Sequence, residues 1–114
     1  MALTRNFKET VLRHAQENPA FLAALLEEAA QNVVDGDVET ALGQLRDVVN
    51  AAVGFDSLSR HTGIPKTSLM RMLGDPGDPR AANLASIIAA VSKKVGLRIS
   101  VSADPEKALE SAKS

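Results

Sequence analysis

Four side chains with complementary chemistry lie close together near the middle of the chain: Lys66, Thr67, Met70 and Arg71. On a helix they would share one face, because residues three and four apart are neighbours. A guanidinium fork pairs with guanine O6 and N7, an ammonium or hydroxyl binds a base or a phosphate, and an apolar side chain meets a thymine methyl. The spacing therefore predicts a helix that lies in the DNA major groove.

The same segment contains residues that would hold such a helix in place. Aliphatic side chains at helical spacing predict a buried flank on the second of two short helices. A small residue on the first helix lets the two helices approach, and a glycine marks the turn between them, where a positive φ costs glycine little. The residues expected in these supporting roles are Leu58, Ser59, Gly63, Ile64, Leu69, Met72 and Leu73.

Three further polar residues complete the predicted DNA-binding set: Arg60, Ser68 and Arg80. The two arginines flank the second helix and suit phosphates, and the serine is expected to reach a phosphate or a backbone group. The spacing alone also fits an αα-hairpin with no ligand. The prediction of DNA binding therefore depends on the sequence around the segment as well.

Formal charge is unevenly distributed along the chain. Residues 1–53 carry four Lys/Arg against eight Asp/Glu, a net of −4, whereas residues 54–101 carry seven against three, a net of +4. The last thirteen residues carry two against three, which leaves the whole chain at −1. The basic part contains the two-helix segment, as binding to phosphates requires. A chance division of solvated surface charge is the alternative interpretation.

The composition favours a helical fold. A length of 114 residues suits one domain, and a hydrophobic content of 45% is enough for a core. Only 3% of the residues are aromatic while alanine and leucine are abundant, so we expect an aliphatic, helical core. The sequence has no cysteine, which excludes disulfides and thiolate chemistry. Residues 3–17 are charged and no apolar run has spanning length, which predicts a soluble, cytoplasmic protein.

Capping and turn residues predict the remaining helices. Asn6 with Glu9 forms a capping box, Asn18 before Pro19 starts a second helix, and Asp37 caps a third. Outside the two-helix segment, the expected helices cover 6–17, 19–35, 38–53 and 80–95, with a Gly/Asp/Pro loop over 74–79. The third helix has the clearest apolar stripe and is expected to bury Val38, Ala41, Leu42, Leu45, Val48, Val49 and Ala52.

The segment Leu97–Val101 alternates apolar and polar residues, which is typical of a strand. A lone strand cannot satisfy its backbone, so a partner strand is expected. The simplest partner is the same segment of a second copy, and a sheet of another protein is the alternative. Residues 102–114 are expected to form a flexible tail.

In this order, the elements resemble lambda-repressor-like helix-turn-helix proteins. More closely, they resemble the antidote proteins of bacterial addiction modules, which are the helix-turn-helix antitoxins of toxin–antitoxin pairs. The stripe helix, the segment 58–73, the Gly/Asp/Pro loop, the helix 83–95 and the segment 96–101 carry this resemblance. It implies a homodimeric DNA-binding regulator that represses its own operon and, in many members, neutralises a small ribonuclease-type toxin.

One position departs from the family. The residue before the recognition helix is often a serine that caps the helix, whereas this chain has Pro65 there. Proline supplies a suitable φ but no side-chain cap. This departure affects which residue begins the helix. It does not affect the assignment of the motif.

We therefore predict an all-α, lambda-repressor-like bundle in three parts: a helical extension over 1–36, a helix-turn-helix domain over 37–101 and a tail over 102–114. The two histidines, His14 and His61, have no partner at a catalytic spacing, and neither HExxH nor a P-loop is present. The sequence thus predicts no catalytic residue, metal ligand or cofactor.

Two other functions remain open at this stage. One is a stand-alone repressor with no toxin partner, and the other is a protein-interaction inhibitor that does not bind DNA. The acidic N-terminal helices suit a basic partner protein, or they simply complete the core and the dimer.

Overall fold

The computed structural model describes residues 18–105, and within this range all regular structure is helical. The predicted all-α class is therefore confirmed, while the helix expected over 6–17 lies outside the described residues. The elements are α2 (Pro19–Val34), α3 (Val38–Val48), the π-helical turn η1 (Val49–Val53), α4 (Phe55–Thr62), α5 (Lys66–Met72) and α6 (Ala81–Lys94). Each predicted helix in this range begins or ends within about two residues of its expected bounds.

The predicted caps account for where two of the helices begin. Asn18 Oδ1 accepts hydrogen bonds from the backbone N–H groups of Ala20 and Phe21, at 3.0 and 3.3 Å. Asp37 Oδ1 accepts one from the N–H of Thr40 at 3.4 Å. Each carboxylate or amide oxygen satisfies donors that the first turn of a helix leaves without a partner.

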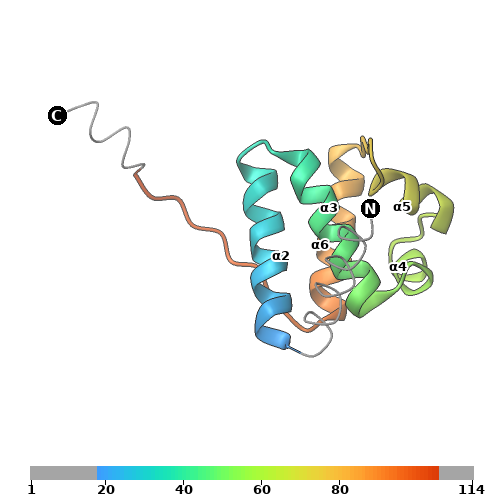
Figure 1. The fold of residues 1–114 in the computed structure, drawn as a ribbon, viewed down its shortest axis with the longest axis horizontal. Helices are drawn as coiled ribbons and strands as arrows, with labels where there is room; N and C mark the ends of the chain where they lie inside the picture. The colour runs from blue at the N-terminus through green and yellow to red at the C-terminus, as the bar shows by residue number, and fades with distance from the viewer. Residues whose placement is uncertain (1–17, 106–114) are drawn as a thin grey trace, which may run out of the picture.

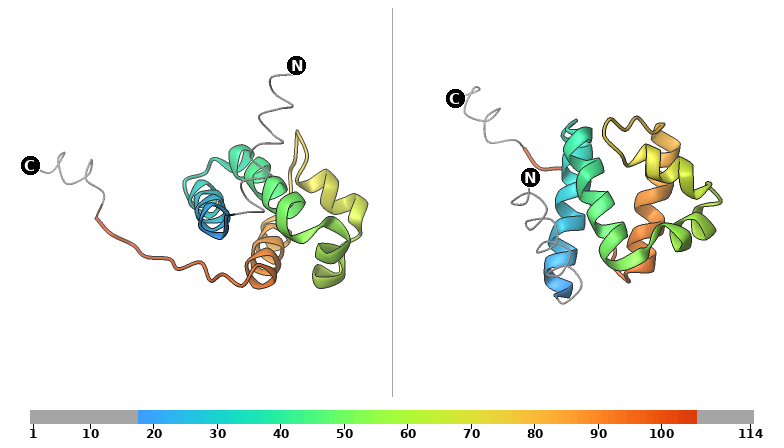
Figure 2. Two further views of the ribbon diagram at one scale, coloured as in Figure 1. Left: turned by 60° about the horizontal axis from the view of Figure 1, so that its bottom comes forward. Right: turned by 45° about the vertical axis from the view of Figure 1, so that its right-hand side comes forward.

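The helices form two groups on either side of α6. Helices α2 and α3 pack side by side, and α4 and α5 lie at the far side of the molecule from α2 (Figures 1 and 2). Helix α4 packs on both α5 and α6. One aliphatic core joins all of these elements, and its buried members include Leu26, Leu42, Leu45, Val48, Leu58, Leu69, Leu73, Leu84, Ile87 and Val91.

The third predicted helix changes its hydrogen bonding before it ends. The N–H of Gly54 donates to Val49 O at 2.6 Å, five residues back, and the last turn is therefore a π turn. A π turn is wider than an α turn, so it rotates the residues at its end about the helix axis. Ala52 is consequently exposed, and the prediction that it would be buried with the stripe was wrong.

The predicted strand over Leu97–Val101 is not confirmed. Residues 18–105 contain no strand, and residues 97–105 follow α6 as an extended segment that runs past α2 (Figure 1). Leu97 and Ile99 still pack on the core from this segment, whereas Val101 is 84% exposed. Among residues 18–105 the segment has no neighbouring strand, which explains why no ladder forms there.

Candidate nucleic-acid interface

Helix α5 has one buried and one exposed face, as the sequence predicts. Leu69 is fully buried, Met72 is half-buried and Leu73, directly after the helix, is fully buried. On the opposite side, the four side chains singled out in the sequence are all exposed: Lys66, Thr67, Met70 and Arg71. Met70, the one apolar member of the four, is 50% exposed. The four therefore share one accessible surface, called here the α5 face.

The turn before α5 is fixed by a local set of hydrogen bonds. Gly63 ends α4 with a φ of +74°, and its N–H donates to Ser59 O at 2.8 Å. The Ser59 hydroxyl donates to Ile64 O at 2.6 Å, and the N–H of Ile64 donates to Thr62 Oγ1 at 3.2 Å. These three bonds tie the end of α4 to the residues that lead into α5. They therefore set the angle between the two helices.

The two ends of α5 are held differently. Pro65 stands at the N-cap position and provides no side-chain hydrogen bond, as expected from the sequence. At the other end, the Arg46 guanidinium of α3 donates through Nη1 to Leu73 O at 3.0 Å. A cation at the C-terminal end of a helix is favourable because the last carbonyl groups carry partial negative charge. This contact was not predicted from the sequence.

The remaining predicted DNA-binding residues lie around the α5 face. Arg60, on α4, and Arg80, directly before α6, are both exposed. Ser68 is half-buried and so does not belong to the exposed face with its neighbours. His61 is exposed, and its ring Nδ1 lies 2.9 Å from Ser57 O within the same helix. Nothing in this local arrangement assigns that imidazole a catalytic partner.

Sequence reasoning missed one contact at the edge of the α5 face. Lys66 Nζ lies 3.2 Å from Asp56 Oδ1, which belongs to the first turn of α4. The two lie ten positions apart in the sequence, and no periodicity links them. Only the angle between α4 and α5 brings their side chains together.

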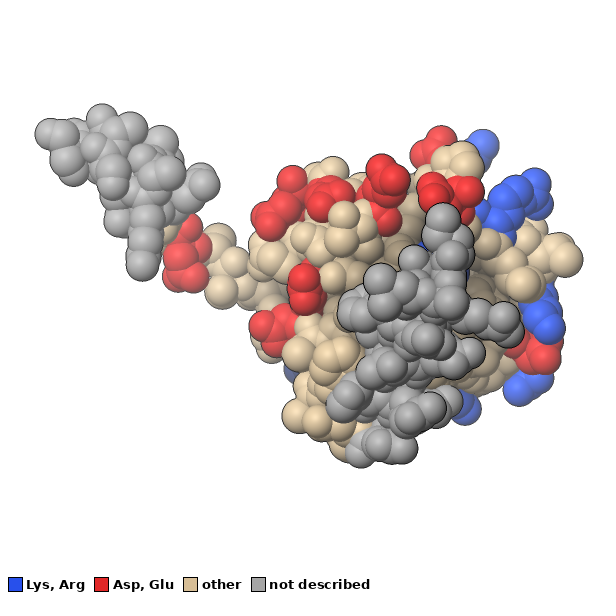
Figure 3. Space-filling model, in the orientation of Figure 1, with Lys and Arg blue, Asp and Glu red and all other residues tan. Residues whose placement is uncertain are grey.

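Charge on the surface follows the division seen in the sequence. Acidic side chains gather over the ends of α2 and α3, and basic side chains gather over α4 and α5 at the opposite edge (Figure 3). The basic edge coincides with the α5 face. Such a separation gives the molecule one surface that attracts anions and another that attracts cations.

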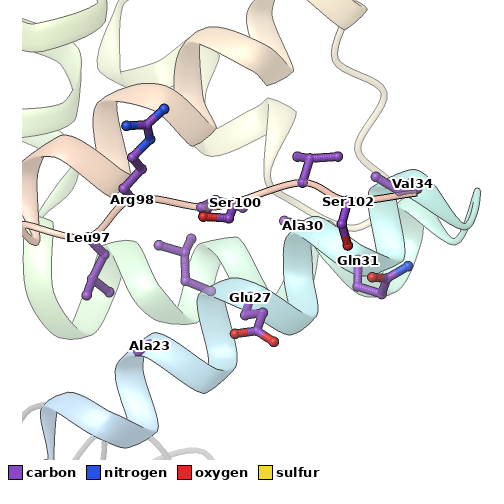
Figure 4. Close-up of a pocket in the computed structure, with 12 residues that line it drawn as sticks. Ala23, Glu27, Ala30, Gln31, Val34, Leu97, Arg98, Ser100 and Ser102 are labelled. Atoms are coloured by element: carbon purple, nitrogen blue, oxygen red, sulfur yellow. The ribbon is translucent and has the colours of Figure 1, made fainter. Parts of the chain in front are cut away.

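A hollow lies between α2 and the extended C-terminal segment. Its volume is about 470 Å³, and it is lined by Leu26, Glu27, Val34, Leu97 and Ile99 among others. In the close-up, Leu97 and Arg98 leave the extended segment on opposite sides, with Leu97 on the side of α2 (Figure 4). The lining mixes apolar and polar side chains, with Glu27 and Arg98 as its charged groups, and their arrangement does not resemble a catalytic centre.

Residues 18–105 contain no group of three or more His, Cys, Asp or Glu side chains placed to hold a metal ion. In the same range, no helix combines the length and the hydropathy needed to cross a membrane.

Comparison with known proteins gives no relative: no family model, no curated protein and no solved structure matches this chain.

Proposed function

We propose that this protein is a sequence-specific DNA-binding transcriptional regulator of the helix-turn-helix class. Helix α4, the turn 63–65 and α5 constitute the motif, and α5 is the recognition helix. The observation that carries the proposal is the two-sided character of α5: Leu69 and Leu73 are fully buried, while Lys66 and Arg71 are exposed. A helix held in this way can present its polar face to base edges in a major groove.

Each residue of the α5 face has a distinct role in the proposal. Arg71 pairs with guanine O6 and N7 through its guanidinium fork, and Lys66 contacts a base or a phosphate near the start of the helix. Thr67 adds a hydroxyl hydrogen bond, and Met70 packs on a thymine methyl. Arg60 and Arg80 bind phosphates on either side and fix the register of the helix on the duplex.

The regulator acts as a cytoplasmic homodimer on an inverted repeat. The extended segments Leu97–Val101 of two copies pair, because this segment meets no strand within the described range 18–105 and its apolar residues alternate. Two recognition helices then lie about one DNA turn apart, on the order of 34 Å.

Selection from a pool of duplexes with a random core tests the proposal. The protein should enrich an inverted repeat whose half-site centres are about 10 base pairs apart. The variant Lys66→Ala/Arg71→Ala should lose this enrichment. The control Lys93→Ala/Lys94→Ala removes the same charge from exposed positions in the last turn of α6 and should enrich the same sequence. A wild-type protein that enriches no sequence would refute the proposal.

The acidic side of the molecule favours a second activity, the neutralisation of a basic toxin as the antitoxin of a toxin–antitoxin module. Five acidic residues on or beside α2 and α3 are exposed: Glu27, Glu28, Asp35, Asp37 and Glu39. Helix α2 lies at the far side of the molecule from α5 (Figure 1). A small ribonuclease binds RNA and is therefore expected to present a basic surface. Both activities can coexist in one chain because the two surfaces are separate.

Co-purification with the product of the neighbouring gene separates these functions. An antitoxin that represses its own operon captures that product and also binds DNA. A chain that binds DNA but captures no product is a stand-alone repressor. A chain that captures the product without binding DNA is a protein-interaction inhibitor.

A further inference from the structure

A carboxylate stands at the edge of the proposed DNA-binding surface. Between residues 54 and 73 the sequence has one acidic residue, Asp56, among the cations Arg60, Lys66 and Arg71. The Asp56 carboxylate lies 3.2 Å from the Lys66 ammonium, and the pair links the first turn of α4 to the first turn of α5.

The Asp56–Lys66 pair contributes little to the stability of the fold. The two side chains are 72% and 49% exposed, and ion pairs between exposed groups are weak because water and salt screen them. Asp56 does not cap α4 either, since Gly54 occupies the N-cap position and no side-chain cap is formed there. As an acidic residue in the first turn of α4, Asp56 gains a modest stabilisation from the helix dipole. That interaction does not require the contact with Lys66, so the pairing itself calls for another explanation.

We infer that Asp56 is a specificity-determining residue: it positions Lys66 for contact with a base and weakens binding to DNA of random sequence. The inference rests on the proposed DNA-binding function. It assigns the positioning of Lys66 to a residue of α4 that lies outside the α5 face.

The positioning effect follows from the chemistry of the ammonium group. Lysine has a flexible side chain of four methylene groups, and its ammonium carries three N–H donors. When Asp56 accepts one of them, the other two stay available to a guanine edge at the start of α5. Fixing the ammonium before binding reduces the entropy that a base contact would otherwise cost.

The effect on random DNA follows from charge. Binding to random sequence depends almost entirely on attraction between basic side chains and phosphates. A carboxylate next to Lys66 reduces this attraction, because at physiological salt charges act over about 8 Å. In the specific complex the Lys66 ammonium meets a base edge, whereas in a non-specific complex it would have to meet a phosphate, which the neighbouring carboxylate repels. The repulsion therefore falls mainly on the non-specific complex.

The substitution Asp56→Asn tests the inference, because it removes the charge and keeps the shape of the side chain. Affinities of the full-length protein are measured for the selected duplex and for a random duplex, at several salt concentrations. For the random duplex, affinity should rise about three- to fivefold, and the slope of log K against log salt should steepen by about 1. The ratio of selected to random affinity should fall about tenfold, since the selected duplex also loses the positioned lysine.

Two controls isolate the Asp56–Lys66 pair. Asp78→Asn removes the same charge from an exposed position in the loop after α5 and should leave the ratio within about twofold of wild type. In a Lys66→Ala background, Asp56→Asn should change the ratio by less than about twofold, because its partner is already absent. An equal loss of specificity in Asp78→Asn, or a full effect of Asp56→Asn without Lys66, would overturn the inference.

The outcomes also separate this inference from the proposed function. If the wild-type protein selects a duplex but Asp56→Asn keeps the same ratio of affinities, only the role of Asp56 is refuted. If the wild-type protein selects no duplex, the DNA-binding function fails, and the role of Asp56 fails with it.

Discussion

At the residue scale, two serines of α4 show that the same hydroxyl group has different effects at different positions. Ser59 donates to Ile64 O at 2.6 Å and fixes the turn before α5. Ser57 is 8% exposed, and its Oγ is buried without a hydrogen-bond partner. A buried hydroxyl that forms no hydrogen bond has lost its water and gained nothing in return.

We therefore expect opposite effects when each serine is replaced by alanine. Ser57→Ala should raise the free energy of unfolding by about 1 kcal/mol, because it removes an unsatisfied polar group. Ser59→Ala should lower it by about 1 kcal/mol, because Ile64 O loses its donor. Urea unfolding of the two variants measures both changes. A stability loss in Ser57→Ala as large as that in Ser59→Ala would contradict this account.

Arg71 and Arg60 should differ in what they contribute to DNA binding. Arg71→Ala should cost about 1–3 kcal/mol on the selected duplex and relax the choice of base at one position, because the bidentate contact to guanine is lost. Arg60→Ala should weaken selected and random duplexes by similar factors, because phosphates carry no sequence. Fluorescence anisotropy titrations with both duplexes test this. Equal losses on both duplexes for Arg71→Ala would exclude its role in base recognition.

At the element scale, the position of α5 depends on the loop that follows it. A Cβ built on Gly77 would overlap Met72 O and lie 2.8 Å from Gly74 O. The loop therefore folds back so closely on the end of α5 that only glycine fits at this position. Together with the bond from Arg46 to Leu73 O, this loop fixes the C-terminal end of the helix.

Gly77→Ala should accordingly destabilise the protein by about 1–3 kcal/mol, because backbone atoms must move to admit the methyl group. Gly43→Ala provides the matched control: in the middle of α3, its Cβ would lie 3.8 Å from Arg46 Nη2, an ordinary contact. That change should stabilise the protein by about 0.5–1 kcal/mol, since alanine favours helix more than glycine. Thermal unfolding measures both, and a stable Gly77→Ala variant would show that the loop does not pack as described.

The sequence predicted those elements whose signals are local. Asn18 and Asp37 cap their helices as expected, and the buried and exposed sides of α5 follow from residues only three or four apart. The π turn after Val48 was not predicted, because the apolar stripe continues through it without a break. Periodicity cannot detect a change in hydrogen bonding that leaves the residue types unchanged.

The contacts between elements were not predictable in the same way. Asp56 meets Lys66, and Arg46 meets Leu73 O, only because the turn at Gly63 and the core set the relative positions of their helices. A strand over 97–101 was predicted from alternation, but alternation alone does not supply a partner strand. In each case the missing information is tertiary, and no residue pattern within one element contains it.

At the scale of the whole molecule, the basic side chains gathered at one edge determine how the affinity for DNA changes with salt concentration. The basic edge over α4 and α5 lies apart from the acidic ends of α2 and α3 (Figure 3). If Arg60 and Arg80 of both copies contact phosphates, four contacts are made, and log K should fall with log salt with a slope of about −4. Anisotropy titrations over a range of salt concentrations measure this slope, and a slope near zero would argue against phosphate binding.

The central claim is that the exposed face of α5 meets base edges, and an NMR titration of the backbone amides with the selected duplex tests it most directly. The largest chemical-shift changes should fall on residues 66–71, on the turn 63–65 and on the flanking Arg60 and Arg80, while the amides of α2 stay in place. Changes concentrated on α2 and α3, with α5 unaffected, would contradict the account.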